Sequence, residues 1–224
     1  MRGIILQHWD GTLTDVEIAS SENIRRYAES IGGSYQMIRG KPFSDRLNAP
    51  CQKLIMLAEE WDTFDVVVML DADMFAPKGM TENVFNLAGV GYHQQTARAR
   101  IRRKLPNLIV DGVPFWGGAI YRLEKGLRER LRSTGATVDE MLEFNARGTG
   151  EDEGIMHMLA TRAGVTEDGA YLDYRWCQGN FEKHPESAGF IHMRSTVRDR
   201  PKFPGNGRDK LANMRQMMAG GVIE

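Results

Sequence analysis

Short apolar segments alternate along the chain with longer segments in which apolar residues are spaced as in helices. The clearest apolar segment is residues 64–70, which lacks an alternating polar face and is therefore typical of a strand covered on both sides. Further strands are predicted at residues 2–7, 35–38, 88–92, 119–123, 171–173 and 190–192.

Helices are predicted between these strands, at residues 15–31, 50 to about 61, 124–133, 138–146, 152–163 and 208–218. The alternation of strands and helices, without an internal repeat, predicts an α/β fold with a mostly parallel central sheet flanked by helices. We expect one domain over residues 1–200. A Pro/Gly turn and a short helix follow over residues 201–224, packed on that domain or trailing it.

The composition is that of a globular protein in a reducing compartment. The chain has 224 residues, of which 42% are hydrophobic, and a formal net charge of −1. Its apolar runs are too short to cross a bilayer, its first residues lack the apolar core of a signal peptide, and Cys51 and Cys177 make no disulfide framework. We therefore expect a cytoplasmic protein without a membrane span. It would lie in the bacterial cytoplasm or, for a phage or viral protein, in the cytoplasm of the host. A secreted mini-protein and a globally basic nucleic-acid binder are disfavoured, and the oligomeric state stays open.

A pair of carboxylates, Asp71 and Asp73, follows directly after the most apolar strand. Ligands of open α/β sheets bind beyond the carboxyl ends of strands, and residues two apart on an extended backbone point the same way. Because a buried carboxylate without a partner is costly, the pair predicts a bound cation, and oxygen ligands favour Mg²⁺ or Mn²⁺. The alternative is two surface acids at a turn.

Four segments resemble GT-A glycosyltransferases, which transfer a sugar from a nucleotide diphosphate. VVMLDAD at residues 67–73 resembles the D-x-D segment of that family. Three others follow in the family's order: WGGAIY at 116–121 is similar to its acceptor-side strand, EDEG at 151–154 to its acidic helix start, and IHM at 191–193 to its late metal-binding strand. The resemblance covers about residues 1–200 and implies a single GT-A-like, Rossmann-related domain, with small viral and bacterial enzymes as its nearest subgroup.

The resemblance implies a metal site and a donor. Asp73 would bind the metal, Asp71 would bind the metal, a metal-bound water or the ribose, and His192 would complete the set. An imidazole ligand favours Mn²⁺ over Mg²⁺. The cofactor would therefore be Mn²⁺ or Mg²⁺, and the donor a nucleotide-diphosphate sugar, with UDP favoured over GDP. The metal would neutralise the departing diphosphate.

Two acids are the expected catalytic residues. Asp152 and Glu153 fall in the first turn of a helix, where the macrodipole favours negative charge whatever their function. The resemblance implies that one of these acids, with Asp152 favoured, acts on the acceptor. In an inverting displacement it would deprotonate the acceptor hydroxyl, and in a retaining reaction it would position the acceptor. The sequence leaves both stereochemical outcomes open.

The donor is expected to contact the loop after the first strand and the region before the D-x-D segment. Trp9 or His8 is available to stack on the base, while Arg46 and Lys53 are in a position to reach the diphosphate. The residues expected to bind the donor are Gln7, His8, Trp9, Asp10, Arg46, Lys53, Asp71 and Ala72. Packing of Trp9 on a helix, and solvation of the two cations, are the alternatives.

Two basic runs flank these motifs, one at residues 98–104 and one from Arg194 to Lys202. Such runs are usually solvated faces, but here they are also candidates to grip a diphosphate or an anionic acceptor. The expected acceptor is a hydroxyl of a carbohydrate or of a phage or viral macromolecule, with a modified DNA base as a less favoured alternative. Two other functions stay open, a sugar nucleotidyltransferase and a catalytically decayed nucleotide-sugar-binding module.

Overall fold

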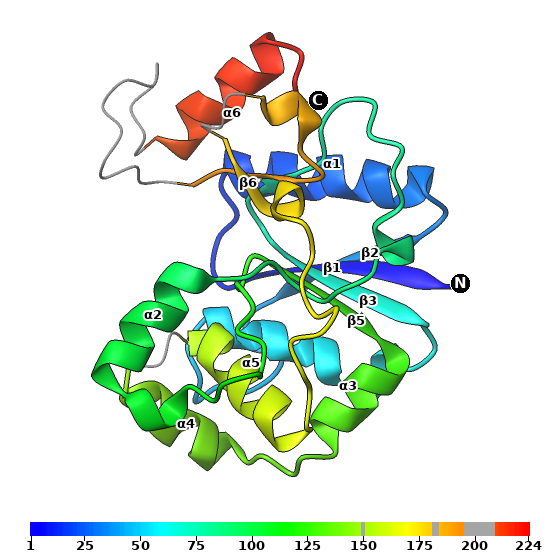
Figure 1. Ribbon diagram of the computed structural model, residues 1–224. Helices are drawn as coiled ribbons and strands as arrows, with labels where there is room; N and C mark the ends of the chain where they lie inside the picture. The colour runs from blue at the N-terminus through cyan, green and yellow to red at the C-terminus, as the bar shows by residue number, and fades with distance from the viewer. Residues whose placement is uncertain (149–150, 181–183, 195–208) are drawn as a thin grey trace.

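A four-stranded sheet forms the middle layer of the molecule (Figure 1). The computed structural model describes residues 1–148, 151–180, 184–194 and 209–224. In spatial order the strands are β2 (Ser34–Arg39), β1 (Gly3–Trp9), β3 (Val66–Asp71) and β5 (Ile120–Glu124). β1 is parallel to both β2 and β3, whereas β5 is antiparallel to β3. The predicted mostly parallel sheet is therefore confirmed.

Helices cover both faces of this sheet (Figure 1). α1 (Asp15–Ser30) packs on one face, and α6 (Lys210–Ala219) packs on α1. The 3₁₀-helix η1 (Pro50–Leu57), α3 (Lys125–Arg132) and α5 (Glu151–Arg162) cover the other face. α4 (Val138–Ala146) packs on α5, and α2 (Gln95–Lys104) lies on the same side of the sheet.

The side chains of β3 explain why this strand is apolar throughout. Val67 and Met69 point into the core under η1, α3 and α5, while Val68 and Leu70 point into the core under α1. A strand buried on both faces needs apolar residues at every position. Polar residues appear only where β3 ends, at Asp71.

A small second sheet lies beyond the end of β3. It consists of β4 (Met74–Phe75), β7 (Ile191–His192) and β6 (Gln178–Gly179), in that spatial order. β4 and β7 are antiparallel, with Met74 opposite His192. This pairing brings a late segment of the chain next to the residues that follow β3.

Two predicted strands are wrong. Residues 88–92 and 171–173 are joined by an isolated bridge between Gly91 and Tyr171 and form no ladder. Gly89 has φ of +91°, and a Cβ there would lie 2.6 Å from the Tyr171 carbonyl carbon. The backbone therefore crosses the neighbouring segment too closely and with the wrong dihedral angle for a regular strand.

The predicted helix over residues 50–61 is also different in the structure. It consists of two 3₁₀-helices, η1 and η2 (Glu59–Trp61), separated by the extended residue Ala58 with ψ of 150°. Further 3₁₀ segments are η3 (Val84–Asn86), η4 (Pro106–Leu108), η5 (Tyr174–Cys177) and η6 (Pro185–Ser187). Two-residue strands such as β4 and β6 carry too little periodicity to be predicted.

The C-terminal helix packs on the rest of the chain. Met214 and Met217 of α6 contact the cluster that contains Val16 of α1 and Phe75 of β4. The expected boundary at residue 200 and the Pro/Gly turn lie outside the described residues. Within the described ranges, none of the helices has the length and hydropathy that a membrane crossing requires.

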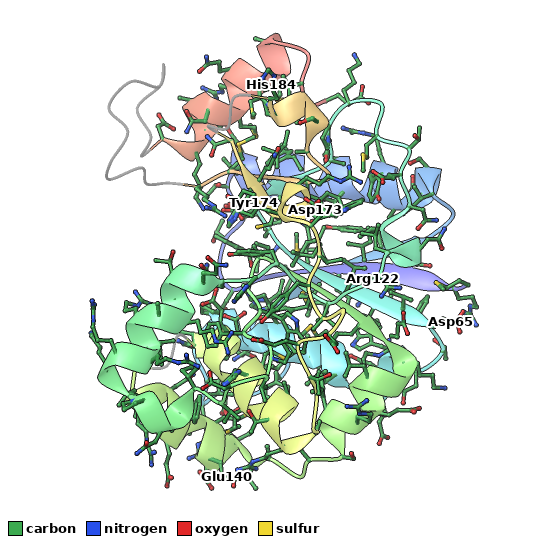
Figure 2. The ribbon with its side chains drawn as sticks, viewed as in Figure 1. Asp65, Arg122, Glu140, Asp173, Tyr174 and His184 are labelled. Carbon is green, nitrogen blue, oxygen red and sulfur yellow. The ribbon has the colours of Figure 1, made fainter. Side chains whose placement is uncertain are left out.

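A buried arginine shows how charge is tolerated in the sheet layer. Arg122 on β5 is labelled near the centre of Figure 2, whereas Glu140 lies at the outer end of the molecule. The Arg122 guanidinium donates to the Phe85 carbonyl at 2.7 Å and to the Glu124 carboxylate at 3.1 Å. A buried charge of this kind is tolerated because its donors are satisfied.

Leu70 provides a test of the core that carries the end of β3. Leu70→Ala is expected to lower the free energy of unfolding by about 2–5 kcal/mol, because it leaves a cavity under α1. Ile18→Ala on the exposed face of α1 is the control and should change stability by less than about 0.5 kcal/mol. Urea unfolding measures both; a Leu70→Ala loss no larger than that of the control would contradict this packing.

Candidate active site

The ends of β1 and β3 open into a cleft of about 970 Å³. Its walls come from the loops after these strands, the start of η1, the start of α5, and the segments around Gly118 and His192. The lining residues are His8, Trp9, Asp10, Asn48, Ala49, Pro50, Lys53, Asp71, Ala72, Asp73, Tyr92, Gln94, Arg100, Gly118, Ala119, Asn145, Gly148, Glu151, Asp152, Glu153, His192, Arg194 and Lys210. Such a cleft at strand ends is where α/β sheets bind ligands.

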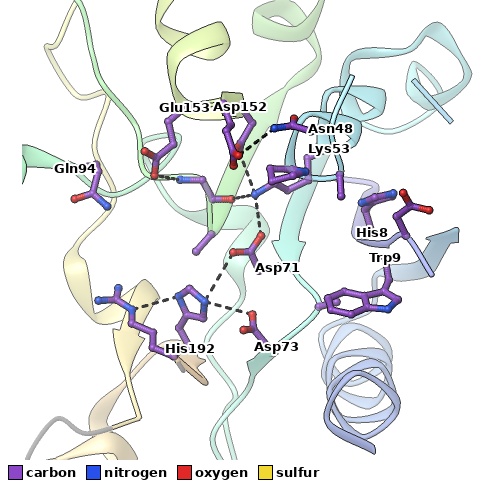
Figure 3. Close-up of a pocket in the computed structure, with 18 of the residues that line it drawn as sticks. His8, Trp9, Asn48, Lys53, Asp71, Asp73, Gln94, Asp152, Glu153 and His192 are labelled. Atoms are coloured by element: carbon purple, nitrogen blue, oxygen red, sulfur yellow. Dashed lines mark hydrogen bonds and ion pairs between the residues drawn. The ribbon is translucent and has the colours of Figure 1, made fainter. Parts of the chain in front are cut away.

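Asp71, Asp73 and His192 come together on one side of the cleft (Figure 3). One ligand atom from each lies within 4.8 Å of the others. His192 Nε2 is 3.3 Å from Asp73 Oδ1 and 3.8 Å from Asp71 Oδ2. The β4–β7 pairing creates this contact, because Met193 N–H donates to the Asp73 carbonyl at 2.9 Å.

His192 and Lys210 supply the positive charge that balances Asp73 in this cluster. Burial alone would raise the pKa of Asp73, but His192 and Lys210 hold that pKa well below its usual range. Burial lowers the pKa of His192, but the Asp73 carboxylate outweighs it and raises that pKa to about 10. Two carboxylates and an imidazole also form a donor set that suits Mn²⁺ and accommodates Mg²⁺. The chemistry of the three residues therefore fits a divalent metal.

A buried ammonium group links Asp71 to the start of α5. Lys53 Nζ lies 2.8 Å from Asp71 Oδ1, 3.0 Å from Asp152 Oδ2 and 2.7 Å from the Gly118 carbonyl oxygen. Burial lowers the pKa of Lys53, but the two carboxylates raise it above its ordinary value. Since an ammonium has three N–H donors, these contacts use all of them. Lys53 therefore holds Asp71 and Asp152 in place and presents no free donor to the cleft.

Asp152 is buried, and protein donors hold one of its two carboxylate oxygens. Its Oδ2 accepts from Lys53 and, at 3.0 Å, from the Tyr121 hydroxyl. Gly118 allows this approach, because a Cβ at that position would lie 2.6 Å from the same oxygen. Burial raises the pKa of Asp152, and Lys53 opposes that change.

Glu153 is the acid that faces the cleft with less restraint. The backbone N–H of Gly118 donates to its Oε1 at 3.0 Å, and no described residue donates to Oε2. Burial raises the pKa of Glu153 to about 7. A carboxyl group with a pKa near neutrality can both accept and release a proton there.

The end of β1 and the loop after it form the opposite wall. Figure 3 places His8 and Trp9 on one side of Asp71 and Gln94 on the other. His8 Nε2 lies 2.6 Å from the Gly40 carbonyl oxygen, and burial lowers the pKa of His8. Trp9 is half-buried and lines the cleft, and its Nε1 donates to Thr12 O at 3.0 Å.

Two residues expected to bind the donor lie elsewhere. Gln7 is fully buried, and its amide donates to the Asp71 carbonyl at 2.9 Å and to Ser20 at 3.0 Å. Arg46 is exposed, does not line the cleft and pairs with Asp139 at 2.6 Å. Gln7 thus supports the backbone of Asp71, and Arg46 joins two surface segments.

Solved glycosyltransferases share this architecture. A glycosyltransferase involved in the glycosylation of the major capsid of PBCV-1 matches with a TM-score of 0.58 and 12% identity, over 96% of this chain and 98% of that one. The galactosyltransferase LgtC, in complex with donor and acceptor sugar analogues, matches with a TM-score of 0.53 and 14% identity, over 98% and 96%. An active-site mutant of LgtC gives 0.54 at 12% identity over the same shares.

The chain has the GT-A fold. Near-complete coverage of both chains confirms the fold that the four sequence motifs predicted. At such low identity the match establishes backbone architecture rather than a reaction. Neither protein-family models nor curated protein sequences gave a match.

Within this GT-A fold, several cleft residues carried no signal in the sequence. Lys210 is paired with Asp73, although the two are separated by 137 positions. Asn48 donates to Glu151 at 3.0 Å, and Gln94 donates to the Tyr92 hydroxyl at 2.9 Å. No spacing rule connects these residues to the D-x-D segment, and only tertiary structure brings them to the cleft. Arg198, Arg200 and Lys202 of the second basic run lie outside the described residues.

Lys53 offers a test of the buried charge network. Lys53→Met is expected to destabilise the protein by about 3–5 kcal/mol, because it leaves the buried Asp152 carboxylate without its cation. The double variant Lys53→Met/Asp152→Asn should recover part of that loss. Urea unfolding measures the effect, with exposed Lys125→Met as control. The network would be refuted if Lys53→Met matched the control or the double variant recovered nothing.

Proposed function

We propose that this protein is a metal-dependent glycosyltransferase that moves a sugar from a nucleotide-diphosphate donor to a hydroxyl acceptor. The observation that carries the proposal is the group of Asp71, Asp73 and His192 at the end of β3, with ligand atoms within 4.8 Å of one another. The GT-A fold supports it, since the solved structures that share the fold are glycosyltransferases. LgtC was solved with donor and acceptor sugar analogues.

Different residues of the cleft are proposed to bind the metal and to stabilise the leaving diphosphate. Asp71, Asp73 and His192 would hold Mn²⁺ or Mg²⁺, which when bound supplies positive charge for the leaving diphosphate. Arg194 and Lys210 line the same part of the cleft and add positive charge from the protein itself. The bond between the anomeric carbon and the phosphate oxygen breaks with its electron pair on that oxygen, so cations gathered here favour departure.

The nucleoside is proposed to lie against the end of β1 and the loop after it. Trp9 offers an aromatic face, and His8 and Asp10 line the same wall. Ala72 lines the cleft between the two aspartates, where a small side chain leaves room for a ligand. We take UDP as the first nucleotide to test and GDP as the second.

Glu153 is the stronger candidate for the acid that acts on the acceptor. Asp152 was favoured from sequence, but its Oδ2 is held by Lys53 and Tyr121. Glu153 keeps Oε2 free of described protein donors and has a pKa of about 7. In an inverting displacement Glu153 would take the proton of the acceptor hydroxyl as its oxygen bonds to the anomeric carbon. In a retaining reaction it would position that hydroxyl.

Asp73→Asn tests the metal-dependent donor site. The variant should bind UDP in the presence of Mn²⁺ at least about 100-fold more weakly, because it loses a metal ligand. Isothermal titration calorimetry with UDP and GDP, with and without Mn²⁺, measures the change, and circular dichroism checks the fold. Exposed Asp168→Asn is the matched control. Equal Mn²⁺-dependent binding by Asp73→Asn would refute the proposal, as would wild type that binds neither nucleotide.

Glu153→Gln tests the proton acceptor. With a pKa of about 7, the wild-type carboxyl ionises as pH rises from about 6 to 8, so release of UDP from a UDP-sugar should accelerate over that interval. The amide cannot ionise, so the variant should lose that pH dependence together with about 10²–10⁴-fold of the rate. Exposed Glu22→Gln should keep the wild-type profile. If Glu153→Gln kept both the wild-type rate and its rise between about pH 6 and 8, Glu153 would not be the proton acceptor.

A further inference from the structure

The cations of α2 fall into two sets with different surroundings. Arg98 and Arg102 are four residues apart, so they share one face of the helix. Arg98 pairs with Glu167, and Arg102 pairs with Asp111. These ion pairs attach α2 to neighbouring segments, so this set has a structural role.

The second set is Arg100, Arg103 and Lys104, which follow one another at i, i+3 and i+4 on another face. All three are exposed, and none has an ion pair within the described part of the chain. We call these three residues the α2 basic row. Like charges at this spacing repel one another, although the helix dipole favours Arg103 and Lys104 in the last turn of α2. A bound anion would relieve the repulsion.

The row starts at the cleft and leads away from it. Arg100 lines the cleft, as does Gln94 at the start of α2. Arg103 and Lys104 lie about one helical turn farther along, roughly 5 Å from Arg100 by helical rise. On the inner face of α2, Ala97 and Ile101 pack in a cluster with Phe115, which fixes the orientation of the helix.

The location of the row assigns it to the acceptor rather than to the donor. Gln94 and the His8–Trp9 wall lie on opposite sides of Asp71 (Figure 3). The proposed nucleoside contacts use the His8–Trp9 wall, and the diphosphate would lie at the metal ligands beside Arg194 and Lys210. An acceptor therefore enters on the side where α2 begins, close to Glu153.

The chemistry of the row favours an acidic saccharide over a nucleic acid. Single-stranded nucleic acids are usually bound by cations together with aromatic side chains that stack on the bases. The sequence of α2, QTARARIRRK, contains no aromatic residue. Carboxylate, phosphate or sulfate groups on a sugar require only charge and hydrogen-bond donors, which arginine and lysine provide.

We propose that the α2 basic row binds an anionic group of the acceptor, and that the acceptor is an acidic saccharide. This inference rests on the proposed function, because only a glycosyl transfer has an acceptor. It adds the chemical class of that acceptor and the residues that select it.

Binding of labelled oligosaccharides tests this inference. The probes are tetrasaccharides that carry carboxylate, phosphate or sulfate groups, a neutral tetrasaccharide, and a short oligothymidylate, each followed by fluorescence anisotropy at about 20 mM and about 200 mM NaCl. Wild type should bind at least one acidic saccharide more tightly than the neutral one, and less tightly at the higher salt concentration. Arg100→Gln/Arg103→Gln/Lys104→Gln should weaken that binding at least about tenfold.

Matched controls separate this inference from charge in general and from the proposed function. Lys41→Gln/Lys78→Gln/Lys125→Gln removes the same charge from exposed positions outside the cleft and should bind the acidic probe as wild type does. Binding of UDP with Mn²⁺, measured by calorimetry, should be unchanged in the α2 variant. If wild type bound no UDP, the proposed function would fail, while the anisotropy would still report on the row.

The inference would be overturned by equal binding of acidic and neutral saccharides, or by an α2 variant that behaves like the lysine control. Tighter binding of oligothymidylate than of every saccharide would assign the row to nucleic acid instead. Loss of UDP binding in the α2 variant would assign it to the donor. Circular dichroism shows whether the α2 variant is folded. The single change Arg100→Gln repeats the test with a smaller alteration of the helix.

Discussion

The electrostatic repulsion among carboxylates at the end of β3 is the constraint on which the site depends. Asp71, Asp73, Asp152 and Glu153 all line one cleft, and two of them are almost fully buried. Such a group is tolerated only if positive charge is supplied within a few ångströms. Lys53 supplies it between Asp71 and Asp152, and His192 with Lys210 supplies it at Asp73. A divalent metal would take over the second of these roles.

Strand pairing and one 3₁₀-helix position much of this charge network. Antiparallel pairing of β5 with β3 places Gly118 beside Asp71, and the β4–β7 pair places His192 beside Asp73. η1 packs on one face of the sheet and places Lys53 next to Asp71. Because these contacts rest on a doubly covered sheet, the acids are held in defined positions even where their charges would drive them apart.

The sequence predicts much of this arrangement, for identifiable reasons. β3 and its terminal aspartates are recognisable because a strand buried on both faces must be apolar and a polar pair at its end is conspicuous. The three metal-ligand candidates and both acids of α5 do come together in the cleft. The contacts that lead us to propose Glu153 in place of Asp152 could not be predicted, since they depend on which carboxylate Lys53 and Tyr121 hold.

Other features were out of reach of sequence reasoning. Lys210 lies far along the chain from Asp73, and a lone lysine in a short helix predicts nothing about a cleft. Residues 88–92 carry apolar residues typical of a strand, yet the left-handed Gly89 and close contact with Tyr171 prevent a ladder. Gln7 and Arg46 have suitable chemistry in suitable segments, but their directions are set by packing.

Crystals of the protein grown with Mn²⁺ and UDP provide the most direct test of the central claim. Anomalous diffraction near the manganese absorption edge locates the ion without reference to the rest of the map. We expect an anomalous peak at an ion held by Asp73, by His192 and by Asp71 or a water bound to Asp71, with the UDP diphosphate at the same ion. A peak at other residues, or bound UDP without a metal at this cluster, would contradict it.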